Sequence, residues 1–224
     1  VYTTWTTRGG HIKRVAATGG AAETLTRFEG YYLDPTVTPD GSKVVYLSGP
    51  VSDQLYSILL DTPPADDPDQ EAQAPGEIGG ISPPSTLEIR WMPATGGPST
   101  FVAGAQNGRR PHFAAEDSAC IYLTSPRGLQ SIDISGYDRR THLRVTGSGA
   151  GNNPPAAEEI RLSPDGARAF VNLQGRHYVV PVPRAGRETV DVHVQGRGDG
   201  ASVPLTRLSQ EGGDYLAWSA DSTT

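Results

Sequence analysis

The residues that could do chemistry in this chain are few, and their spacing matches no complete catalytic motif. Metal-dependent hydrolysis requires a His-x-His pair on a strand, together with further histidine and aspartate ligands. The five histidines are far apart and form no such pair: His11, His112, His142, His177 and His193. We therefore predict no catalytic residue of this kind, no bound metal and no cofactor.

Two glycine-rich segments and the single cysteine also fail as catalytic motifs. The run Gly147–Gly151 has the wrong Gly–Ser spacing for a hydrolase nucleophile, and the segment Asn152–Pro155 that follows it is not a helix start. Gly196 and Gly198 lack the strand-to-helix context of a phosphate-binding loop. Cys120 lies in an apolar run, which predicts a buried strand residue, and it has no partner for an internal disulfide.

The composition excludes several classes of protein. The 27 glycines and 19 prolines make up about one residue in five, and both residue types interrupt helices, which excludes a helical bundle. The short apolar runs of a chain that is 36% hydrophobic argue against wholesale disorder. No stretch approaches the length of about 18 apolar residues that spans a membrane. The net charge of −6 disfavours nucleic acid as a partner.

One sequence pattern occurs four times and must build the elements that position any site. Each of the first three copies has a turn and then an apolar run, at Thr38–Ser48, Ala115–Ser125 and Ser163–Val171, and an apolar residue lies just before the turn. The fourth copy, Trp218–Ser222, breaks off after its turn. Proline presets φ, aspartate bonds to nearby backbone, and glycine accepts positive φ, so each copy predicts a β-hairpin. The turn residues are Pro39, Asp40, Gly41, Asp117, Pro164, Asp165, Gly166 and Asp221.

A third and a fourth strand are predicted after each hairpin. His11–Gly20 and Leu87–Gly97 both indicate a strand that ends in a Gly-Gly turn, and short outer strands such as Thr24–Arg27 follow. Four-stranded antiparallel units at this spacing are typical of propeller blades. We therefore predict an all-β fold: a β-propeller domain over residues 1–224, with about four repeats. The acidic, proline-rich segment 61–84 is predicted to be a solvated loop inserted in the second unit.

The turn pattern, most clearly at Thr38–Ser48 and Ser163–Val171, resembles the TolB-type propeller repeat. This resemblance covers most of the chain outside residues 61–84. It implies a β-propeller exported to the bacterial periplasm or secreted, but it implies no single function, because such blades occur in many proteins.

The C-terminal third carries a second resemblance. Glu159–Gly166, Tyr178–Pro183 and Gly212–Asp221 are together similar to the propeller that precedes the metal-dependent domain of certain bacterial amidohydrolases. In that family the hydrolytic domain lies downstream in the same polypeptide. The resemblance therefore implies a parent hydrolase to which this propeller is accessory.

Aligning the repeats places one set of side chains at the start of the innermost strands. Because these strand starts converge around one mouth of a propeller channel, we predict a partner-binding surface there. Its residues are Asp34, Arg110, Glu159 and Asp214, with Tyr32 and Tyr215 nearby.

Two functions are compatible with this pattern. The first is a non-catalytic interaction or scaffold propeller, accessory to a hydrolase domain or to a cell-envelope complex. The alternative is a propeller enzyme, a hydrolase or lyase, with an acidic site of Glu158, Glu159 and Asp214 at the channel mouth. The absence of a catalytic motif favours the first function.

The two ends of the sequence predict parts of blades. Val1–Trp5 corresponds to a second strand without a first strand, and Asp214–Ser219 corresponds to a first strand without a second. If the ring closes on itself, these segments pair and bring Trp5 and Trp218 into one blade. We expect instead that the chain is a piece of a larger ring, whose other parts cover the open edges.

Overall fold

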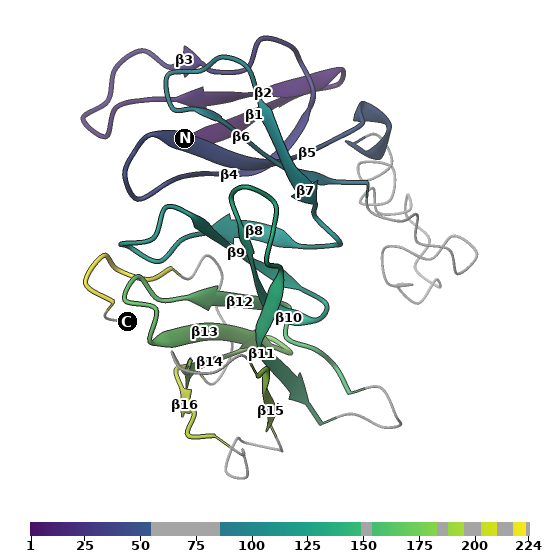
Figure 1. The fold of residues 1–224 in the computed structure, drawn as a ribbon, viewed down its shortest axis with the longest axis vertical. Coiled ribbons are helices and arrows are strands. Elements are labelled where there is room, and N and C mark those ends of the chain that lie inside the picture. The colour runs from purple at the N-terminus through teal and green to yellow at the C-terminus, as the bar shows by residue number, and fades with distance from the viewer. Residues whose placement is uncertain (55–85, 149–153, 183–187, 195–202, 210–216, 223–224) are drawn as a thin grey trace, which may run out of the picture.

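The computed structural model describes residues 1–54, 86–148, 154–182, 188–194, 203–209 and 217–222. Four small sheets follow one another along the long axis of the molecule, as expected for successive propeller blades (Figure 1). The described helical structure is a single turn at residues 51–54. Within the described ranges, no helix has the length and apolar character needed to cross a membrane. The predicted all-β propeller fold is therefore confirmed.

Each sheet is assembled mainly from strands that are neighbours in sequence. The first contains β1 (Tyr2–Thr6), β2 (Gly9–Arg14) and β3 (Glu23–Thr24). The second contains β4 (Tyr31–Val37), β5 (Lys43–Gly49), β6 (Glu88–Pro93) and β7 (Thr100–Gly104). The third contains β8 (Arg109–His112), β9 (Cys120–Ser125), β10 (Gly128–Asp133), β11 (Arg140–Gly147) and β15 (Val190–Val194). The fourth contains β12 (Glu159–Leu162), β13 (Arg168–Leu173), β14 (Arg176–Pro181) and β16 (Thr206–Arg207).

Apolar side chains fill the space between consecutive sheets. Ile12 packs with Tyr46 and Met92 between the first and second sheets. Corresponding layers lie between the second and third sheets and between the third and fourth. Alternating strand residues point to opposite faces, so both faces of an inner blade can be buried. These layers hold the strand starts of adjacent sheets close together.

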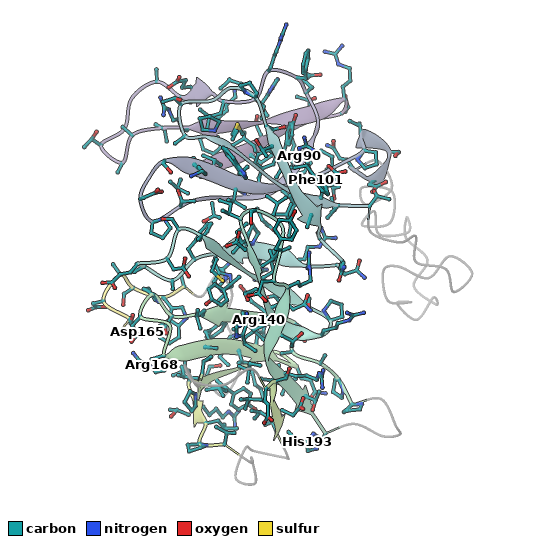
Figure 2. All side chains as sticks on the ribbon, viewed as in Figure 1. Arg90, Phe101, Arg140, Asp165, Arg168 and His193 are labelled. Atoms are coloured by element: carbon teal, nitrogen blue, oxygen red, sulfur yellow. The ribbon has the colours of Figure 1, made fainter. Side chains whose placement is uncertain are left out.

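The third sheet departs from the predicted four-stranded unit. Its fifth strand, β15, comes from the connection between β14 and β16 of the fourth sheet and pairs in parallel with β11. Val192 and Val194 of β15 are buried in the layer between these sheets, whereas Asp191 and His193 are exposed. The side chain of His193 lies near the lower end of the molecule in Figure 2. This strand links the outer edges of two blades, which the short repeat pattern did not predict.

The turns of the repeated pattern are also linked from blade to blade. The N–H of Asp40 donates to Ser118 Oγ at 3.2 Å, and the N–H of Asp165 donates to Ser222 Oγ at 2.9 Å. Within the turns, the Oδ1 atoms of Asp40, Asp117 and Asp165 each accept the N–H two residues later. The aspartates therefore hold the turn backbone, and the serines join one turn to the next.

The segments near the two ends of the sequence have different neighbours. β1 pairs with β2, and the ring of Trp5 lies 5.5 Å from that of Tyr31. Trp218 Nε1 instead donates to the carbonyl of Arg161 in the fourth sheet, at 3.1 Å. In the part of the chain that the structure describes, Trp5 therefore lies in the first sheet, whereas Trp218 contacts the fourth. The predicted insertion 61–84 and the residues 214–216 lie outside the described residues.

Candidate functional site

The innermost strands β4 and β8 share an unusual backbone feature at the same register. Asp34 and Arg110 both have positive φ, 48° and 53°, and each precedes a proline. Strand pairing slips at both positions, which marks a β-bulge. Residues other than glycine rarely adopt a positive φ. β-Bulges are common next to binding sites, where they change the direction in which a side chain points. The repeat therefore presents a strained residue at the same place in two blades.

These residues belong to a chain of polar contacts across three sheets, which we call the inner-strand ladder: Asp34, Arg110, Glu159 and Arg161. The N–H of Arg110 donates to Asp34 Oδ2 at 2.9 Å. Arg110 Nη1 forms an ion pair with Glu159 Oε2, and Arg161 Nε forms another with Glu159 Oε1. The ladder thus connects β4 to β8 and β8 to β12.

The members of the ladder differ in exposure. The side chain of Glu159 is only 12% exposed, whereas that of Arg110 is 47% exposed. Burial lowers the pKa of Arg161, and the charge of Asp34 opposes that shift. Glu159 is therefore the buried anchor of the ladder. Arg110 retains free surface through which a partner could accept its hydrogen bonds.

A partly buried histidine contacts both of the strands that carry Arg110 and Glu159. His112 Nε2 accepts the N–H of Leu162 at 2.9 Å, and its Nδ1 lies 2.9 Å from the carbonyl oxygen of Arg110. This geometry requires the neutral ring with its proton on Nδ1. Burial is the main cause that lowers the pKa of His112 to about 4, and the charge of Arg161 acts in the same direction. His112 therefore fixes the backbone of Arg110 relative to β12.

The structure places three of the six predicted surface residues in the ladder: Asp34, Arg110 and Glu159. Tyr32 lies apart from them, because its ring packs edge-on against Tyr46 and its hydroxyl donates to the carbonyl of Phe28 at 3.2 Å. Asp214 and Tyr215 lie outside the described residues.

Sequence analysis missed Arg161 and His112. Arg161 stands two positions after Glu159, and residues at this spacing share one face of a strand. That spacing was a usable signal for a contact within one strand. His112 could not be recognised in this way, because its partner Leu162 is 50 residues away.

The acidic side chains of the ladder contact N–H and guanidinium donors. Among the described residues, no group of three or more His, Cys, Asp or Glu side chains could hold a metal ion. In the ladder, Asp34 accepts a backbone N–H and Glu159 contacts two guanidinium groups. These contacts suit a rigid polar surface that positions charged groups.

Comparison with solved structures identifies the fold. A TolB structure from Acinetobacter baumannii is similar at a TM-score of 0.50 and 13% sequence identity, over 94% of this chain and 51% of that chain. The chain has the fold of a TolB-type β-propeller. A putative TolB from Agrobacterium tumefaciens is 13% identical with a TM-score of 0.47, over 90% of this chain and 67% of that chain.

This TolB-type propeller resembles known proteins in its fold. The matched part of the chain spans about half the length of the Acinetobacter structure. No protein-family model matches the sequence, and no curated protein matches it.

Proposed function

We propose that this chain is a non-catalytic protein-interaction propeller whose inner-strand ladder contacts a partner protein. The observation that carries this proposal is the repeated bulge at Asp34 and Arg110. Two strained residues at the same register cost folding free energy, and such strain persists where surrounding contacts over-determine it, often at binding sites. The half-exposed Arg110 side chain, anchored by the buried Glu159, is suited to an interface because arginine is enriched there.

The setting follows from the sequence resemblances. We place the propeller in the bacterial periplasm, as an accessory to a hydrolase domain of the amidohydrolase type or to a cell-envelope complex. The similar Acinetobacter baumannii structure is a TolB, and the fold likeness supports a related architecture. A propeller can serve a neighbouring domain because its strand starts form one broad contact face.

Site-specific photo-crosslinking in the native host tests this proposal. A photoreactive residue at exposed position 158, beside Glu159, should capture a discrete protein that the same residue at exposed position 116, in a turn, does not capture. The substitution Arg110→Glu should abolish this adduct. Identical adducts from both positions, or an adduct that survives Arg110→Glu, would contradict the proposal. Metal-dependent amide hydrolysis by the purified chain would contradict the non-catalytic role.

A further inference from the structure

Two hairpins in different blades have the same type of turn, closed by the same set of hydrogen bonds. Thr6–Gly9 joins β1 to β2, and Ser125–Gly128 joins β9 to β10. In both, the hydroxyl of the first residue accepts the N–H of an arginine, at 3.2 Å for Arg8 and 3.1 Å for Arg127. The same hydroxyl donates to the carbonyl of the closing glycine, at 2.7 and 3.1 Å.

The hydroxyl side chain and the glycine backbone make the hydrogen bonds of this turn. Gly9 and Gly128 have φ of 138° and 106°, and a Cβ on Gly128 would lie 2.1 Å from the carbonyl oxygen of Leu143. The arginine contributes only its backbone, so its side chain is available for another purpose. We call Arg8 and Arg127 the hairpin-tip arginines.

Few acidic side chains lie close enough to the hairpin-tip arginines to neutralise their charge. The Arg8 side chain is 84% exposed, and its acidic neighbour Glu29 is 4.0 Å away, at the limit of an ion pair. Arg127 is exposed and forms no ion pair with any residue that the structure describes. Its charge also acts with burial to lower the pKa of Arg139, so a second cation lies close by.

Both tips lie at the end of the blades that carries the ladder. The backbone of Gly10, beside the first tip, pairs with Gly30, directly before β4. Thr124, beside the second tip, pairs with Arg109 at the start of β8. An exposed aromatic ring accompanies the first tip: Phe28 is 68% exposed, and the guanidinium of Arg27 lies 5.1 Å from its centroid.

Several acidic side chains lie together at the opposite end of the blades. A hollow of about 470 Å³ lies between three of the repeated turns, and its acidic lining residues are Glu116, Asp117, Asp165 and Asp221. Asp165, which lines this hollow, lies at the left of the molecule in Figure 2. Acidic side chains around this hollow and exposed arginines at the hairpin tips can orient a charged partner during encounter. An acidic partner is therefore guided to the ladder end.

We propose that the hairpin-tip arginines bind an acidic, extended segment of the partner protein, whose carboxylates pair with Arg8 and Arg127 while its apolar groups cover Phe28. Guanidinium groups match carboxylates in a fixed planar geometry. Aromatic and arginine side chains together form the usual centre of a protein interface. This inference rests on the proposed function, because it names the chemistry of the partner at the same end of the propeller.

Fluorescence anisotropy with a defined probe tests the inference. The probe is a labelled twelve-residue peptide of alternating Glu and Ser, and the comparison probe has Lys in place of Glu. We expect the intact chain to bind the Glu peptide at low ionic strength, to release it at high salt, and to ignore the Lys peptide. The double substitution Arg8→Ala with Arg127→Ala should raise Kd at least tenfold.

The matched control is Arg14→Ala, at the end of β2 away from the first tip, which removes a partly exposed arginine that pairs with Glu23 at 2.8 Å. It should change Kd less than twofold. Absence of Glu-peptide binding, equal binding by the double variant, or tighter binding of a single-stranded oligonucleotide would overturn the inference. If the probe fails while the Arg110-dependent adduct persists, only this inference falls. If the probe binds through Arg8 and Arg127 but the adduct ignores Arg110→Glu, the proposed function of the ladder falls.

Discussion

His112 Nε2 accepts the N–H of Leu162 at 2.9 Å, and this bond joins the innermost strands of two neighbouring blades. A protonated imidazole has no acceptor nitrogen, so acid breaks this link. The position of the ladder consequently depends on one neutral histidine between β8 and β12.

We predict that His112 makes stability fall as the pH drops from about 6.5 to about 4. The pKa of His112 is lowered to about 4 in the folded chain, against about 6.5 when unfolded. In that window the unfolded state binds the proton and the folded state does not, so acid favours unfolding, by up to about 3 kcal/mol. Denaturant titrations of the protein and of His112→Gln should show a shallower pH dependence for the variant. Parallel curves would refute this assignment.

The buried acid of the ladder should matter more than its exposed neighbour. Glu159→Gln leaves Arg110 and Arg161 without their shared carboxylate. Because the two guanidinium groups are partly exposed, we expect a loss of about 1–2 kcal/mol. Glu158→Gln is the matched control, because Glu158 is exposed and should change stability by less than about 0.5 kcal/mol. Chemical denaturation of both variants measures the difference. Equal effects would show that the ladder adds no stability.

The closing glycine of the second shared hairpin should tolerate no side chain. Gly128→Ala introduces a Cβ 2.1 Å from the Leu143 carbonyl oxygen at a φ of 106°, so we expect a loss of about 2–4 kcal/mol. At Gly19, φ is 87° and nothing lies within 4 Å of the added Cβ. Gly19→Ala should therefore cost only about 1 kcal/mol, from backbone strain alone. Thermal melts that rank the two variants in the opposite order would contradict this geometry.

The fifth strand of the third sheet should contribute to the core. Val192 of β15 is 1% exposed, and its truncation to Ala should cost about 1–3 kcal/mol because two methyl groups leave a packed layer. His193→Ala, on the exposed face of the same strand, should cost less than about 0.5 kcal/mol. Hydrogen exchange should also show slow amides in Val190–Val194, since β15 pairs with β11. Fast exchange there would argue against the pairing.

The all-β propeller could be predicted because its signals are local. A turn such as Thr38–Gly41 depends on φ preferences and on side-chain bonds over two or three residues, and the alternation of apolar residues along each strand marks the buried faces. The order β4-β5-β6-β7 in the second sheet follows from such signals. The positions of Asp34, Arg110 and Glu159 at equivalent strand starts followed from the same repeat.

The amino-acid sequence by itself determined the repeated hairpins, the fold class and the strand starts, because each depends on residues that are near neighbours in the chain. Only the tertiary structure decided that Glu159 binds Arg110, that His112 meets Leu162, and that β15 joins a blade other than its own. These contacts join residues that are about 50 positions apart in the chain. They form because the apolar layers bring the sheets together, and packing over that distance leaves no periodic mark in the sequence.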